Sequence, residues 1–209
     1  MILYEEGRIE EAKEYFHKGA QLGQSSAMNI YAVIIQKEGN IEEAKEYFHK
    51  GAHLGDSQAT FNYAVIIQKE GNIEEAKEYF KKAAHLGHSS SMYNYAVIIQ
   101  KEGNIEEAKE YFHKGAHLGD SQATFNHALI LYEEGNIKEA KEYFKKAGQL
   151  GYSDSMYNYA VIVQKEGNIE EAKELNLFFK YKAIKLIILF LLQSPLSSLL
   201  FIISLSLST

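Results

Sequence analysis

The chain has 209 residues, of which 46 % are hydrophobic, and its formal net charge is −6. This composition indicates a folded protein rather than a disordered one. The acidic balance and the single arginine, Arg8, exclude the basic face of a nucleic-acid-binding protein, so we expect no nucleic-acid partner. The absence of cysteine excludes disulfide bonds and thiolate metal sites.

A Glu-Gly dipeptide recurs every 32 residues, at Gly7, Gly39, Gly71, Gly103, Gly135 and Gly167. Fixed periods of about 20–50 residues are the signature of repeat architectures. A longer period is superimposed on this one, because residues 31–64 and 95–128 differ only at Tyr63 and His127. The sequence therefore predicts an array of 32-residue units that includes a 64-residue duplication.

Each unit predicts two helices. The first, helix A, is expected near 25–38, 57–70, 89–102, 121–134 and 153–166, and the second, helix B, begins near 8, 41, 73, 105, 137 and 169. In the unit that begins at Ser89, we expect the serine hydroxyl to cap helix A, Gly103 to end it in the left-handed conformation, and Asn104 to cap helix B. A hairpin this small cannot bury its own apolar stripe, so neighbouring units must stack.

Residues 93–119 read YNYAVIIQKEGNIEEAKEYFHKGAHLG. This stretch resembles a tetratricopeptide-type hairpin, and especially the related Sel-one-like repeats. The resemblance rests on the small residues Ala96, Ala108 and Ala116, the turn glycine Gly103 and the aromatic Phe112. It implies an all-α fold, a right-handed α-solenoid (superhelix) of 32-residue helix-turn-helix repeats, and a non-enzymatic scaffold that binds a protein or peptide segment in its concave groove.

We expect this array to occupy residues 1–174, with four complete helix pairs and partial units at both ends. Helix A should line the concave surface, where recurring asparagine amides could hold the backbone of an extended peptide, or could instead be solvated or bond to the next helix. Nearby aromatic and lysine side chains suit an interface, although the aromatics could equally pack between repeats. The predicted groove comprises Asn62, Asn94, Asn126, Asn158, Phe61, Tyr93, Phe125, Tyr157, Lys69, Lys101 and Lys165.

Two histidine pairs, His49 with His53 and His113 with His117, have the i, i+4 spacing that can chelate a transition metal. Because that face of helix B is polar and no third ligand is fixed beside it, we expect a solvated surface, with no metal and no other cofactor. No phosphate-binding loop or nucleophile motif occurs, so no catalytic residue is predicted.

The repeat pattern fails at Leu175, and residues 175–209 form a hydrophobic tail unrelated to the array. No charge follows Lys185, and residues 186–207 have the length and apolar character of a membrane span. Since the N-terminus lacks a signal-peptide pattern, we expect a cytoplasmic protein. One alternative is an adaptor that the tail anchors to a membrane; the other is a gene fragment or pseudogene product with an accidental tail.

Overall fold

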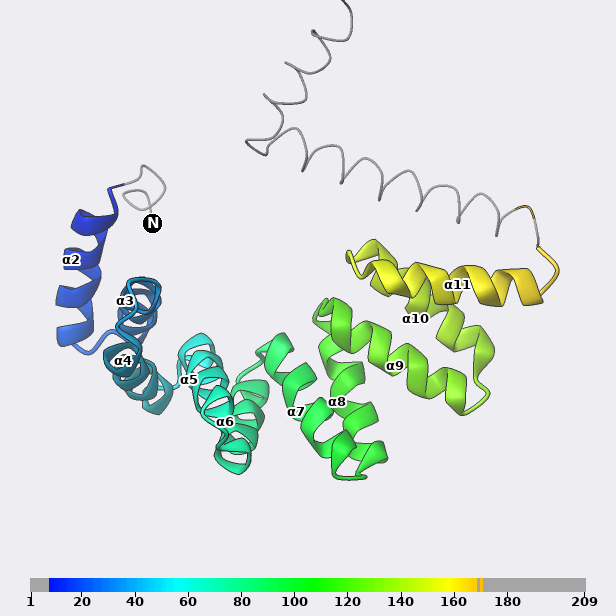
Figure 1. The fold of residues 1–209 in the computed structure, drawn as a ribbon, viewed down its shortest axis with the longest axis horizontal. Helices are drawn as coiled ribbons and strands as arrows, with labels where there is room; N and C mark the ends of the chain where they lie inside the picture. The colour runs from blue at the N-terminus through cyan, green and yellow to red at the C-terminus, as the bar shows by residue number, and fades with distance from the viewer. Residues whose placement is uncertain (1–7, 169, 171–209) are drawn as a thin grey trace, which may run out of the picture. The chain divides into compact units, whose positions relative to one another are not determined.

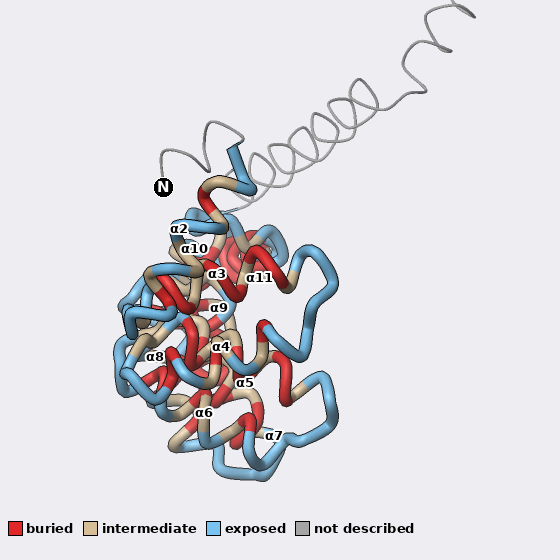
Figure 2. Tube along the Cα trace, turned by 90° about the vertical axis from the view of Figure 1, so that its left-hand side faces the viewer, coloured by how far each residue is buried: buried red, intermediate tan, exposed pale blue. Residues whose placement is uncertain are grey.

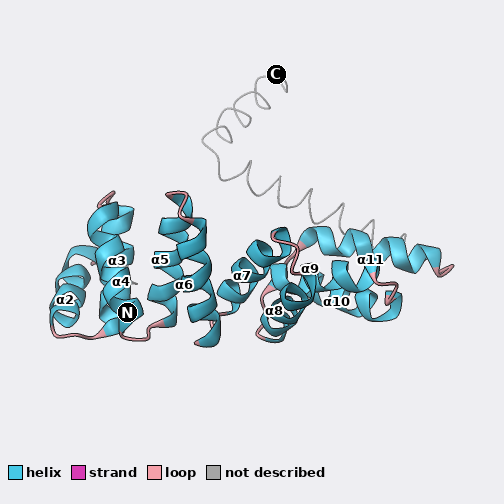
Figure 3. Cartoon of the chain, turned by 90° about the horizontal axis from the view of Figure 1, so that it is seen from below, coloured by secondary structure: helices cyan, strands magenta, loops and turns pink. Residues whose placement is uncertain are grey.

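A computed structural model describes residues 8–168 and 170 of the chain. Within these residues the backbone forms α-helices joined by short turns and contains no strand (Figure 1, Figure 3). The helices are α2 Ile9–Gln21, α3 Ser25–Lys37, α4 Ile41–His53, α5 Ser57–Lys69, α6 Ile73–His85, α7 Ser89–Lys101, α8 Ile105–His117, α9 Ser121–Glu133, α10 Ile137–Gln149 and α11 Ser153–Lys165. The predicted helix bounds are confirmed to within one residue, whereas the helix expected from 169 and the tail lie outside the described residues.

The chain divides into two compact units between Ile130 and Leu131. In the first unit, α3 packs on α4, α5 on α6 and α7 on α8, which makes three antiparallel hairpins. Each helix B also packs on the helix A that follows it, as α4 does on α5, and α3 also contacts α5. In the second unit, α10 packs on α11. The predicted solenoid of helix-turn-helix repeats is therefore confirmed.

Glycine ends each helix because only a residue in the left-handed region can reverse the chain so sharply. Gly103, with φ of +90°, donates its amide to the Gln100 carbonyl at 3.0 Å, and the Asn104 amide reaches back to the Ile99 carbonyl at 2.9 Å. This pair of bonds is the Schellman motif, which satisfies carbonyls that the helix end would otherwise leave unpaired. The predicted role of Gly103 is confirmed.

The prediction that serine caps helix A is wrong by one position. In α5 the capping residue is Asp56, whose Oδ1 accepts a hydrogen bond from the Ala59 amide at 2.7 Å, while Ser57 is the first helical residue. The reason is geometric: after Gly55, a single extended residue suffices before helical geometry begins. In α8, by contrast, the predicted cap is confirmed, since Asn104 Oδ1 accepts from the Glu107 amide at 3.4 Å.

His88 caps α7 with an imidazole nitrogen. Its Nδ1 accepts from the Ser91 amide at 3.2 Å, which leaves the proton on Nε2 to donate to Gln58 Oε1, also at 3.2 Å. Burial lowers the pKa of His88 below 6.5, and the carboxylates of Asp56 and Asp120 oppose that shift only in part. The folded protein therefore holds this imidazole neutral, because a proton on Nδ1 would remove the capping acceptor.

The core lies between successive helices, and the same buried positions recur in each 32-residue repeat (Figure 2). Alanines with no exposed surface, such as Ala64 and Ala76, let the two helices of a hairpin approach closely. One phenylalanine of each helix B fills the remaining space, and Phe48, Phe80 and Phe112 are likewise fully buried. Burying such a side chain contributes about 1.5–3 kcal/mol, so these positions hold the stack together.

Glycine also allows helix B to approach the next helix A. A Cβ atom built on Gly51 would lie 2.7 Å from the Ala59 Cβ, and one on Gly115 would lie 2.8 Å from the Ala123 Cβ. Real Cβ atoms do not approach so closely, so the α4–α5 and α8–α9 contacts need glycine. At the equivalent position α6 carries Ala83, opposite Ser91, so this inter-repeat contact differs along the array.

The first prediction concerns the core. Replacing Phe80 by alanine should lower the free energy of unfolding by about 3–5 kcal/mol, because it empties a fully enclosed site between hairpins. Leu118→Ala is the matched control: its side chain is 54 % exposed and should change stability by less than about 0.5 kcal/mol. Urea denaturation followed by circular dichroism measures both, and equal effects would contradict the assignment of the core.

The second prediction concerns the His88 cap. Because the folded-state pKa lies below the unfolded value, the unfolded chain binds the proton more readily, so this contribution is present above about pH 6.5 and is lost below it. His88→Asp copies the cap that Asp56 provides and does not titrate in this range. The melting temperature should therefore fall less in this variant than in the wild type between about pH 7.5 and 5.5. Parallel pH profiles would contradict the assigned role.

Candidate functional site

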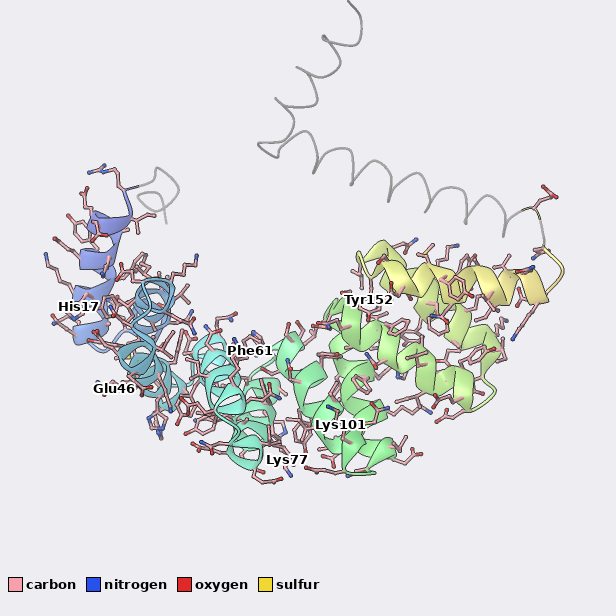
Figure 4. The ribbon with its side chains drawn as sticks, in the orientation of Figure 1. His17, Glu46, Phe61, Lys77, Lys101 and Tyr152 are labelled. Atoms are coloured by element: carbon pink, nitrogen blue, oxygen red, sulfur yellow. The ribbon has the colours of Figure 1, made fainter. Side chains whose placement is uncertain are left out.

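The predicted groove residues lie on one side of the helices A, which we call the helix-A face. In the first unit it comprises exposed or partly exposed residues of α5, α7 and the start of α9, namely Phe61, Asn62, Lys69, Tyr93, Asn94, Lys101, Phe125 and Asn126. Figure 4 shows Phe61 on the upper edge of this unit and Lys77, from helix B, on the lower edge. In the second unit, α11 carries Tyr157, Asn158 and Lys165.

Asn62 joins two successive helices A. Its Nδ2 donates to Asn29 Oδ1 on α3 at 2.9 Å, and its Oδ1 accepts from Gln58 Nε2 at 3.4 Å. A bond from this asparagine to another helix, one of the alternatives considered, is therefore observed. The Asn62 amide therefore joins two repeats and is also partly exposed to solvent.

The other asparagines bond to their own helix. Asn94 Nδ2 donates to the Ser90 carbonyl at 2.7 Å, and Asn126 Nδ2 donates to the Gln122 carbonyl at 2.8 Å. Asn158 in the second unit makes the same contact with the Asp154 carbonyl at 3.3 Å. Each bond uses one N–H of the amide, so the second N–H and the side-chain carbonyl have the capacity to bind another group.

Two aromatic residues of the helix-A face, Phe61 and Tyr93, pack against neighbouring rings. The Phe61 ring stacks on His88, with centroids 4.5 Å apart and an interplanar angle of 24°, and lies 6.0 Å from Phe80. Tyr93 lies 6.0 Å from Phe112. Phe61 therefore packs on the next repeat through His88, whereas Tyr93 contacts Phe112 of its own hairpin. Tyr157 in the second unit is 67 % exposed.

Lysines stand at the carboxyl ends of the helices A. Lys69 and Lys101 are the last helical residues of α5 and α7, and both are exposed. A cation there interacts favourably with the helix dipole. Lys165 ends α11 and donates to the Tyr132 hydroxyl at 3.1 Å. The face therefore presents positive charge at one end of its helices.

Ion pairs between lysine of helix B and glutamate at the end of the following helix A recur with a separation of 25 residues. Lys77 Nζ lies 2.8 Å from Glu102 Oε1 in the first unit, and Lys141 Nζ lies 2.6 Å from Glu166 Oε2 in the second. Exposed pairs of this kind contribute about 0–1 kcal/mol each, so they favour one register of stacking more than they stabilise the fold.

The second glutamate of the pair that opens α4 and α6 has a further role that sequence reasoning missed. Tyr31 donates its hydroxyl to Glu43 at 3.1 Å, and Tyr63 donates to Glu75 at 3.1 Å. Burial, followed by the hydrogen bond to the carboxylate, raises the pKa of both tyrosines to about 12. The separation of 12 residues between tyrosine and glutamate, which recurs in three successive repeats and includes Tyr95 with Glu107, was the available signal.

The expected solvated surface at the histidine pairs is wrong for His49. This side chain is half-buried, its Nε2 lies 3.1 Å from the Tyr79 hydroxyl, and its ring centroid is 4.8 Å from that of Tyr63. His113 is also half-buried, with its ring 4.9 Å from His127. The reason is that stacking brings the next hairpin over this side of helix B.

Shallow pockets of about 420 and 540 Å³ lie along α10, and one of about 200 Å³ lies beside His49. The predicted groove residues line none of these three. Among the described residues, no group of three or more histidine, aspartate and glutamate side chains is placed to share a metal ion. Within residues 8–168 and 170, no helix is both long and apolar enough to cross a membrane, and residues 186–207 lie outside that range.

Two family models match the chain. The Tetratricopeptide repeat model matches residues 57–86, 89–116 and 121–149, and the Sel1 repeat model matches residues 3–24 and 27–56. Together they cover most of the array, and both kinds of repeat named in the sequence resemblance are found. No curated protein sequence matches the chain.

Solved structures with the same fold include a Sel1 repeat protein from Oxalobacter formigenes, with a TM-score of 0.75 and 20 % identity over 87 % of this chain and 84 % of that one. The protective antigen c5321 of uropathogenic Escherichia coli, which displays an SLR fold, has a TM-score of 0.66 and 24 % identity over 74 % of this chain. This chain covers 36 % of that antigen.

YrrB, a TPR protein, has a TM-score of 0.53 and 22 % identity over 78 % of this chain and 89 % of its own. At such identities these likenesses show the fold alone. Tetratricopeptide and Sel1 repeat proteins generally mediate protein interactions and are typically not enzymes. With the repeat period, the stacked hairpins and both family models in agreement, the chain belongs to the tetratricopeptide and Sel1 repeat family.

Proposed function

We propose that this protein is a non-enzymatic interaction scaffold, without a cofactor, that binds an extended peptide segment of a partner protein along the helix-A face. One observation carries the proposal. Asn94 and Asn126 occupy the same position of two successive helices A, both are partly exposed, and each retains an N–H and a carbonyl beyond its contact with its own helix. Amides repeated in this way match the alternating donors and acceptors of a peptide backbone.

The neighbouring side chains favour an extended ligand with acidic residues. Phe61 and Tyr93 present partly exposed aromatic rings beside Asn62 and Asn94, and such rings are common anchors in interfaces. The exposed Lys69 is positioned to attract carboxylates of the ligand to one end of this row. The contacts of Phe61 with His88 and of Tyr93 with Phe112 also support binding, because anchors already held in place lose little conformational entropy on association.

The comparisons support the class of function. YrrB is described as a TPR protein with an unusual peptide-binding site, and its fold is similar to that of this chain. The tail-anchored adaptor depends on residues 175–209, which lie outside the described residues. The comparisons support neither this alternative nor a gene fragment or pseudogene product.

The third prediction tests the asparagines. A peptide selected by display against the full chain should bind the double variant Asn94→Ala, Asn126→Ala more weakly, because each lost hydrogen bond contributes about 0.5–1.5 kcal/mol. Two bonds correspond to roughly a 5- to 150-fold rise in Kd. Isothermal titration calorimetry measures the change, and circular dichroism should show unaltered helix content.

A matched control replaces two exposed side chains of helix B, Glu78→Ala with Glu110→Ala, which should leave the affinity for the peptide within about twofold. Undiminished affinity in the asparagine variant, with its fold intact, would return Asn94 and Asn126 to a purely structural role. A loss in both double variants would place the peptide elsewhere on the array.

A further inference from the structure

Two histidine pairs in the first unit have the same geometry. On α4, His49 Nε2 and His53 Nε2 lie 3.1 Å apart, and on α8, His113 Nε2 and His117 Nε2 lie 3.0 Å apart. The ring centroids of each pair are 4.4 Å apart, and the ring planes are nearly perpendicular. In each pair, therefore, the two Nε2 atoms face each other across one turn of helix.

The separation of these nitrogens suits two bonds to one metal ion. Imidazole nitrogens bind zinc at about 2.0–2.1 Å, and similar bond lengths to two nitrogens place them about 2.9 Å apart at a right angle and about 3.3 Å apart at the tetrahedral angle. The observed 3.1 and 3.0 Å both fall inside this range, and the 3.0 Å of the α8 pair is nearer the right angle. Nitrogen ligands at right angles are typical of Ni²⁺ and Cu²⁺.

The surroundings of His49 also favour metal binding. Burial, reinforced by the neighbouring His53, lowers the pKa of His49 below 6.5, so the imidazole is neutral at neutral pH, as a metal ligand must be. The positive charge of Lys82 disfavours a cation near His49, although the Lys82 amine donates to the Ala52 carbonyl at 2.9 Å. The negative charge of the Glu75 carboxylate favours a cation there. The Tyr79 hydroxyl also contacts Nε2 of His49, at 3.1 Å, so a metal ion bound to this nitrogen replaces that contact.

We propose that each of these histidine pairs binds one Ni²⁺ or Cu²⁺ ion through its two Nε2 atoms, with water completing the coordination. The chain therefore holds two equivalent sites on α4 and α8, away from the helix-A face. The other described helices B lack the pair, since α2 has His17 and Gln21, α6 has Lys81 and His85, and α10 has Lys145 and Gln149. These helices are natural controls within the same molecule.

The fourth prediction is tested with Ni²⁺ and the full chain without a polyhistidine tag. Isothermal titration calorimetry should give two equivalents of bound Ni²⁺, and the melting temperature should rise with its concentration because the metal binds the folded chain preferentially. His53→Ala should remove one equivalent, and His53→Ala with His117→Ala should remove both. The control His17→Ala with His85→Ala also removes two histidines and should keep both equivalents.

A gain-of-site variant guards against loss of binding through misfolding. Lys81→His should raise the stoichiometry from two to three, because α6 already carries His85 four residues further on. Three outcomes would overturn the proposal: no Ni²⁺ binding at about 1 mM, equal stoichiometry in the two double variants, or a stoichiometry of two in Lys81→His.

Discussion

The burial of one phenylalanine per repeat between closely packed hairpins is the constraint on which the rest of this structure depends. Phe48, Phe80 and Phe112 have no exposed surface, and alanines such as Ala64 and Ala76 bring the helices of each hairpin close enough to enclose them. A single hairpin has no second layer to cover such a ring. Stacking is therefore required for burial, and it sets the spacing of every surface residue.

Polar contacts follow from this stacking rather than cause it. The pair Lys77–Glu102 and the contact between His49 and Tyr79 each join residues 25 or 30 positions apart, which meet only when one hairpin lies on the next. Each contributes modestly by itself, yet repetition along the array gives the stack one register. The same register places Asn94 and Asn126 at equivalent positions of successive helices A, as the proposed peptide site requires.

Repetition also divides possible binding roles between the two faces of the first unit. The helices A carry amides, aromatic rings and lysines suited to a peptide, whereas two helices B carry paired imidazoles suited to a metal ion. Because the two sets project from different helices, a change in one set can leave the other intact. Substitutions on one surface of a solenoid can thus leave its core and its other surface unchanged.

The sequence by itself determined the 32-residue period, the helix bounds and the left-handed glycines such as Gly103, because these depend on periodicity and local backbone preference. It also identified the groove candidates, but not what they touch. Only the tertiary structure placed the α5 cap at Asp56, bonded Asn62 to Asn29, and brought His49 into contact with Tyr79 of the next hairpin. Contacts between side chains about 30 residues apart depend on how closely the hairpins stack, and that distance is set by packing at Phe80 and Gly51, not by the local pattern of either repeat.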